Sequence, residues 1–240
     1  MSRIYDAMKR GAALEASRRS LAAAGPQGAP LVDRVAEGYQ RVLHAIQGRQ
    51  GAKPGGAILI VSAAHGEGTS TVARELAALL GRNGPTRAVL VDANLRTPSQ
   101  HKAFGVERGG GLTEVVTRGL ALDQAVRNGN SSSVALLTCG RPASHPTGIL
   151  GAPALREVLE GLRAKYAWVI VDGPPATVYS DAGILAPLVD GVVLVVEAEK
   201  TRWQVAEQAK RSLEESGARL LGAVLSRRRF HIPKSLYGLL

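Results

Sequence analysis

The sequence predicts a three-layer α/β fold, in which helices cover both faces of a mainly parallel sheet. Six apolar runs long enough for strands alternate with stretches of helical character, as in sheets joined by crossover helices. The runs are almost continuously apolar, which is typical of strands buried on both faces. A hydrophobic fraction of 45% over 240 residues supports one domain with a substantial core.

The expected elements follow one another along residues 51–240, which we predict to be a single α/β domain. Strands are expected at 57–63, 88–93, 134–138, 168–172, 191–197 and 219–226. Helices are expected at 74–81, 147–165 and 202–216.

Residues 1–50 are expected to form an N-terminal helical arm. Apolar residues recur at helical spacing within 1–20 and again within 31–48, and a Gly- and Pro-containing linker at 51–56 separates the arm from the domain. The first helix reads either as a solvated terminal helix or as a docking helix for a partner or a lipid surface.

The first expected strand runs into a glycine-rich turn and then a helix, and this turn is the first candidate site. Glycines let the backbone approach phosphate oxygens closely, and a helix N-terminus adds partial positive charge there. We therefore predict a phosphate-binding loop (P-loop), in which the Ser70 hydroxyl ligates Mg²⁺. The turn alone would also suit an ordinary glycine turn with a Ser/Thr cap. The predicted cofactor-binding residues are His65, Gly66, Glu67, Gly68, Thr69, Ser70 and Thr71.

Two other strand ends carry candidate catalytic residues. The strand at 88–93 runs into Asp92, Asn94 and Arg96, and the strand at 168–172 ends in Asp172. Ligands of α/β proteins bind at the carboxyl ends of the strands, where a carboxylate can hold Mg²⁺ and an arginine fork can bind phosphate. Each acid alone could cap a turn. Together they predict a metal site of Ser70, Asp92 and Asp172.

Composition limits the remaining classes. A net charge of +10 favours anionic partners, although a generally basic proteome would give the same excess. Aromatic residues make up only 4%, which argues against a base-stacking nucleic-acid platform. The single cysteine, Cys139, excludes an internal disulfide, and no apolar run is long enough for a membrane span. We expect a cytoplasmic protein that reaches the inner membrane through a partner.

The motifs together resemble the bacterial tyrosine kinases (BY-kinases), the polysaccharide-biosynthesis tyrosine autokinases. The resemblance covers nearly the whole chain, and the opening MSRIYDAMKR is similar to an exosortase-associated subgroup. The segment VLVDANLRTPSQHKAFG at 89–105 is similar to the second Walker motif of that family. Further matches are GGGLTEVV, WVIVDGPPA, DAGILAPLVDGVVLVVEAEKT and IPKSLYGLL.

This resemblance implies a P-loop NTPase fold, Mg-ATP as the ligand and polysaccharide export as the setting. The implied partner is a transmembrane polysaccharide co-polymerase, or chain-length determinant, and a homo-oligomer is implied as well. By resemblance, Gly66 to Thr71 bind phosphates, Ser70 and Asp172 hold Mg²⁺, and Asp92 assists the attacking tyrosine hydroxyl.

Several positions depart from the family pattern. Thr69 stands where the P-loop lysine is expected, Asn94 replaces a second acid, and Ser226 replaces an asparagine. The oligomerisation motif reads Glu37-x-x-Gln40-x-x-Leu43, and the C-terminal tail holds Tyr237 without a tyrosine cluster.

The missing lysine bears most directly on chemistry. A cation about 4 Å from a phosphate charge contributes about 4 kcal/mol at an effective dielectric constant near 20. Replacement cations considered from the sequence are Arg74, Arg82, Arg96, Lys102 or an arginine of a neighbouring subunit.

Three functions remain open on these grounds. The first is a regulator of polysaccharide assembly with weakened or lost phosphotransfer, in effect a pseudokinase. The second is an active tyrosine autokinase with an atypical P-loop. The third is a partition-type ATPase that binds membrane or DNA through basic residues such as the run 227–229.

Overall fold

The computed structural model describes residue 48 and residues 55–82, 88–128 and 134–227. The predicted arm at 1–50, residue 48 aside, lies outside these residues, as do the 37–43 motif and Tyr237. Within the described residues no helix has the length and apolar character needed to cross a membrane.

A seven-stranded sheet forms the centre of the described part, in the order β3-β4-β2-β5-β1-β6-β7. All neighbouring strands are parallel except β3 and β4. The six predicted strands are confirmed, whereas β3 was not predicted, because its three residues form no apolar run. The strands are β1 (Gly56–Ser62), β2 (Ala88–Asp92), β3 (Val126–Asn128), β4 (Val134–Leu137), β5 (Trp168–Asp172), β6 (Gly191–Glu197) and β7 (Leu220–Ser226).

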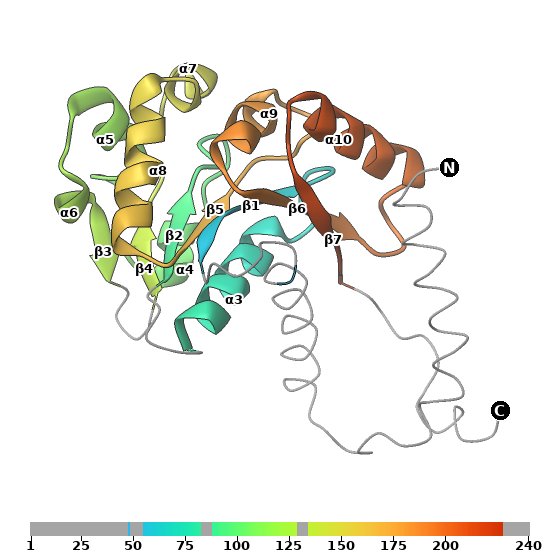
Figure 1. Ribbon diagram of the computed structural model, residues 1–240, viewed down its shortest axis with the longest axis horizontal. Helices are drawn as coiled ribbons and strands as arrows, with labels where there is room; N and C mark the ends of the chain where they lie inside the picture. Colours follow the sequence, from blue (N-terminus) through green and yellow to red (C-terminus); the bar gives the residue numbers. More distant parts are fainter. Residues whose placement is uncertain (1–47, 49–54, 83–87, 129–133, 228–240) are drawn as a thin grey trace, which may run out of the picture. The chain divides into compact units, whose positions relative to one another are not determined.

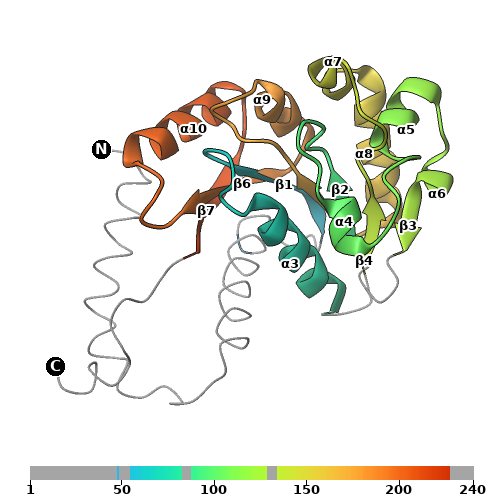
Figure 2. The same cartoon turned by 180° about the vertical axis from the view of Figure 1, so that it is seen from behind.

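Helices cover both faces of this sheet, as predicted. Helix α3 (Thr69–Arg82) lies on one face against β1, β2 and β5, and α8 (Pro153–Lys165) and α10 (Trp203–Glu215) lie on the other (Figures 1 and 2). The shorter helices are α4 (Gln100–Phe104), α5 (Leu112–Arg118), α6 (Leu122–Ala125), α7 (Pro146–Leu150), α9 (Asp181–Leu185) and the 3-10 helix η2 (Ala186–Leu188).

The helix boundaries correct two expectations. The helix expected at 147–165 is two helices, α7 and α8, because the chain breaks at Gly151-Ala152 and restarts with Pro153 in the first turn of α8. Helix α3 begins at Thr69 rather than at 74, so the hydroxyl residues of the glycine turn form its first turn. The short helices between 100 and 125 carry too little periodic pattern to be predicted.

The core lies where β1 passes between β5 and β6. Residues Ala57 to Val61 of β1 are fully buried, and Leu76 on α3 is buried above them. Burying one leucine side chain contributes roughly 2 kcal/mol. Because β2, β5 and β1 are parallel neighbours, their carboxyl ends meet at one edge of the sheet.

Candidate functional site

The glycine turn between β1 and α3 has the backbone of a phosphate cradle. Gly66 and Gly68 have φ of 80° and 89°, in the left-handed region that favours glycine. A Cβ atom at Gly66 would meet nothing within 4 Å, so the turn is not packed against other groups at this residue. The N–H groups of Thr71 and Val72 both donate to the Gly68 carbonyl, which starts the helix directly after the turn.

A buried glutamate holds this turn in shape. Glu67 is 2% exposed, and its carboxylate accepts a hydrogen bond of 2.8 Å from the Ala64 N–H and another from the Thr201 hydroxyl. The Ser226 hydroxyl donates to the Glu67 carbonyl at 2.6 Å. The side chain of Glu67 is therefore used inside the turn and its carbonyl is used by Ser226, so the backbone N–H is the group left for a ligand.

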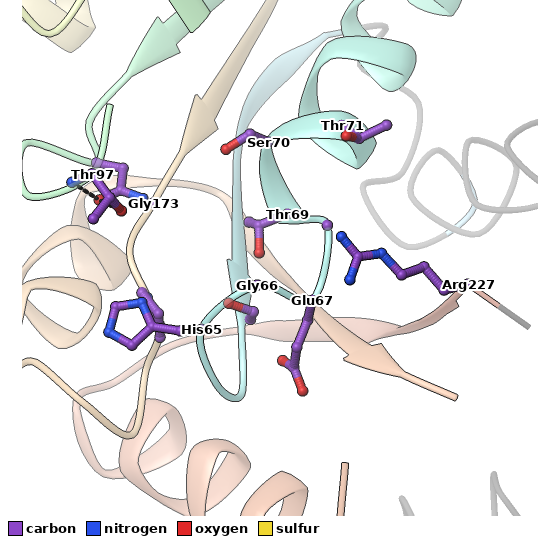
Figure 3. A pocket seen from close by; sticks show the side chains of 13 residues that line it. His65, Gly66, Glu67, Thr69, Ser70, Thr71, Thr97, Gly173 and Arg227 are labelled. Carbon is purple, nitrogen blue, oxygen red and sulfur yellow. Dashed lines mark hydrogen bonds between the residues drawn. The ribbon is translucent and has the colours of Figure 1, made fainter. Parts of the chain in front are cut away.

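The turn borders a hollow of about 230 Å³ (Figure 3). All seven residues predicted to bind the cofactor line it, and Asn94 lines it as well. The neutral Thr69 side chain stands at the point where the turn enters α3, with Ser70 beyond it (Figure 3). The lining residues are Ser62, His65, Gly66, Glu67, Gly68, Thr69, Ser70, Thr71, Asn94, Thr97, Gly173, Pro175 and Arg227.

The two strand-end acids lie side by side, and neither is among the residues that line the hollow. Asp92 and Asp172 are opposite one another in the register of β2 and β5, and both are fully buried. Gln100, also fully buried, links them to the glycine turn. Its side-chain amide donates to Asp172 at 2.7 Å and to the Ser70 carbonyl at 2.9 Å, while its backbone N–H donates to Asp92 at 3.1 Å.

Burial shifts the protonation of both acids. It raises the pKa of Asp92 to about 7, and the charge of Asp172 adds to this, against the N–H groups of Gln100 and Ser99. Burial likewise raises the pKa of Asp172 to about 6, although hydrogen bonds from Gln100 and Ser70 act in the opposite direction. Each acid is thus held closer to its neutral form than a solvated aspartate would be.

These acids fit a hard cation. Asp92 Oδ1 and Asp172 Oδ1 are buried and have no hydrogen-bond partner among the described residues. Buried anionic oxygens without donors are costly, and carboxylate oxygens are the ligands that Mg²⁺ prefers. The hydroxyl of Ser70 lies close enough to Asp172 to lower its pKa, so the three predicted metal ligands come together.

Arg96 is engaged elsewhere. Its guanidinium donates to Asp181 at 2.7 Å and 3.2 Å and to Thr147 at 3.0 Å, and it lies 4.0 Å above the ring of Tyr179. Asp181 is 1% exposed, so the arginine compensates a buried charge. The fork that we expected to face phosphate is occupied by this carboxylate, and Arg96 is not among the residues that line the hollow.

Asn94 shapes the loop after β2. Its Oδ1 accepts hydrogen bonds from the N–H and the hydroxyl of Thr97 at 3.1 Å and 3.3 Å. The amide that stands in place of a second acid thus folds its own loop.

Gln100 and Arg227 were missed from the sequence, as were the lining residues Ser62, Thr97, Gly173 and Pro175. Gln100 lies in no strand and carries no charge, so nothing in the local pattern marked it. Arg227 directly follows β7, and its position after a strand end was a usable signal, but the arginine run was read only as a basic surface.

The strand, the turn with two left-handed glycines, the following helix and the paired strand-end acids define a P-loop NTPase domain. A family model described as ParA, NUBPL iron-transfer P-loop NTPase, matches residues 55–236. Tyrosine-protein kinase YwqD of Bacillus subtilis is 36% identical over 183 residues, which are 75% of this chain and 77% of that protein.

Two solved structures extend this similarity. The chimeric protein CapA2B2 has a TM-score of 0.75 and 26% identity, over 80% of this chain and 84% of that one. The kinase domain of VpsO has a TM-score of 0.72 and 27% identity, over 83% of this chain and 100% of that one. The chain therefore belongs to the bacterial tyrosine-protein kinase family of ParA-like P-loop NTPases.

Proposed function

We propose that this protein binds Mg-ATP and Mg-ADP and acts in exopolysaccharide or capsule biosynthesis and export with weakened or lost tyrosine phosphotransfer. In this role it regulates a membrane co-polymerase through its nucleotide state more than through phosphorylation. It works at the cytoplasmic side of the inner membrane, held there by that partner. Membership of the tyrosine-kinase family and the match of its motifs to the polysaccharide-biosynthesis autokinases support this setting.

One observation carries the proposal: the phosphate cradle is complete in its backbone but carries Thr69 where a lysine is expected. The left-handed glycines, the first turn of α3 and the hollow that the turn lines support binding of a polyphosphate. Thr69 is 8% exposed and neutral, so it adds no positive charge at that point. Loss of the lysine charge would cost up to about 4 kcal/mol of binding free energy, and less in a hollow open to solvent.

Each group has a proposed role. The backbone N–H groups of residues 66–70 would bind the phosphates, and Ser70, Asp92 and Asp172 would hold Mg²⁺, which would supply positive charge to the phosphates. By the family resemblance, Asp92 would also assist the attacking tyrosine hydroxyl as a proton acceptor.

Calorimetric titration of the full chain with Mg-ADP and Mg-ATP tests the binding role, with Thr69→Lys as the comparison. We expect measurable binding by the wild type and binding by Thr69→Lys that is tighter by about tenfold or more. Equal affinities would show that the lysine position has no importance in this chain.

Transfer of phosphate onto tyrosine tests the catalytic half, with the cytoplasmic segments of a co-polymerase present and Asp92→Asn as the inactive control. We expect little phosphotyrosine from the wild type and more from Thr69→Lys. Strong labelling of Tyr5 or Tyr237 by the wild type, lost in Asp92→Asn, would overturn weakened transfer. It would favour the second candidate function, an active autokinase, which the presence of both strand-end acids, Asp92 and Asp172, supports.

A further inference from the structure

The end of β7 is attached to the phosphate loop, although the two are far apart in the sequence. The Ser226 hydroxyl donates to the Glu67 carbonyl at 2.6 Å, and the Ser226 carbonyl accepts from the Ala198 N–H at 3.0 Å. A Cβ atom placed on Gly68 would lie 4.0 Å from the Ser226 side chain. The residue that follows Ser226 therefore has a defined starting point beside the loop.

That residue, Arg227, reaches the hollow. Its φ of 51° is in the left-handed region, so the chain changes direction as β7 ends. Its side chain lines the same hollow as the glycine turn, and its guanidinium points toward the turn between Glu67 and Thr69 (Figure 3). Among the described residues that line the hollow, Arg227 is the one lysine or arginine.

The cations considered from the sequence are placed differently. Arg96 is paired with the buried Asp181. Arg74 and Lys102 are not among the lining residues, and the charge of Arg74 acts to lower the pKa of Asp172. A cation that meets a polyphosphate in this hollow is therefore best supplied by the end of β7.

The carboxylate that now pairs with Arg227 also pairs with a lysine. Arg227 Nη1 lies 3.3 Å from Glu197 Oε2, and Lys200 Nζ lies 3.0 Å from the same oxygen. If Arg227 moves to a phosphate, Glu197 keeps Lys200 as its counter-ion. The Arg227 side chain is 56% exposed, so few packing contacts oppose such a movement. An exposed pair of this kind contributes at most about 1 kcal/mol.

We propose that Arg227 supplies the positive charge that the loop lacks at Thr69, by leaving Glu197 and binding the phosphates of the nucleotide. The planar guanidinium can donate two parallel hydrogen bonds to phosphate oxygens. The charge thus comes from the edge of the hollow, on the last residue described after β7, instead of from the first turn of α3. This inference rests on the proposed nucleotide site and names a residue that determines its affinity.

Calorimetry with Mg-ADP and with Mg-pyrophosphate tests the inference on the full chain. Arg227→Gln is expected to lower the affinity for both ligands by about tenfold, the usual value of a charge-assisted hydrogen bond. Glu197→Gln releases Arg227 and is expected to raise the affinity for both ligands slightly. Arg211→Gln is the matched control, because Arg211 is also an exposed arginine paired with a carboxylate, Glu207, on α10. Equal melting temperatures without ligand show that the variants fold.

The lysine replacement closes the test. In Arg227→Gln, adding Thr69→Lys is expected to restore the affinity, because the lysine then supplies the positive charge that Arg227 no longer provides. Unchanged affinity in Arg227→Gln, with the wild type still binding, overturns the inference and leaves the proposed function standing. A loss for Mg-ADP but not for Mg-pyrophosphate also overturns it, since the arginine would then contact the nucleoside. If the wild type binds neither ligand, the proposed function and this inference both fail.

Discussion

The buried acid pair makes the folded protein less stable as the pH rises, and Asp92→Asn is expected to remove much of that effect. An aspartate in the unfolded chain titrates near 3.8, whereas burial and the charge of Asp172 raise the pKa of Asp92 to about 7. The folded state thus binds this proton more tightly. The stability it provides is complete below about pH 4 and is lost as the pH rises to about 7.

The size of the effect follows from this difference. A shift of about three pKa units corresponds to about 4 kcal/mol at pH 8, because each unit is worth about 1.4 kcal/mol. Asparagine keeps the shape but forms weaker hydrogen bonds with the N–H groups of Ser99 and Gln100, which offsets about 2 kcal/mol. Asp92→Asn should therefore raise the free energy of unfolding by about 2 kcal/mol at pH 8 and by close to zero at pH 5.

Urea unfolding at pH 5, 6, 7 and 8, followed by circular dichroism without nucleotide or Mg²⁺, measures this difference. Asp123→Asn is the control, because Asp123 is exposed and pairs with Lys165 on the surface. A loss of stability in Asp92→Asn that is equal at pH 5 and pH 8 would refute the reasoning. So would a wild type that becomes more stable between pH 5 and pH 8.

Two further substitutions test how the site is held together. Gln100→Leu removes the amide donor to Asp172 and is expected to lower the free energy of unfolding at pH 8 by about 2 to 3 kcal/mol. The control is Gln204→Leu at an exposed position, which should change the free energy of unfolding little in the same urea assay. Glu67→Ala removes the carboxylate inside the glycine turn. The free energy of unfolding is expected to fall by about 2 kcal/mol, and calorimetry is expected to show weaker Mg-ADP binding. Unchanged nucleotide affinity would mean that the turn keeps its shape without this side chain.

Much of the fold was accessible from local pattern. The continuous apolar runs identified six strands because parallel strands buried on both faces need no alternation. Helix ends were less accessible: Pro153 suits the first turn of a helix, so one apparent helix is two. The three-residue β3 pairs with β4 through the backbone alone, and its side chains carry no signal of that pairing.

Some residues of the candidate site were likewise predictable from local sequence pattern, and others were not. The glycine turn and the two strand-end acids were predicted because each follows an apolar strand in the sequence. Gln100 was not, since its importance comes from hydrogen bonds to Ser70 and Asp172, which are distant in sequence. Arg96 was expected to bind phosphate, but it pairs with Asp181, and no sequence pattern links these two residues.

The sequence by itself determined that glycines and hydroxyls follow a buried strand, that Thr69 stands in place of lysine and that acids end two other strands. These are properties of neighbouring residues, whose periodicity and chemistry act locally. The tertiary structure decided which groups meet, because strand order places β1 between β5 and β6 and brings β7 to the phosphate loop. Only that packing brings Arg227 to the hollow lined by the glycine turn. It also buries Asp92 and Asp172 away from water, and the resulting loss of solvation raises their pKa values.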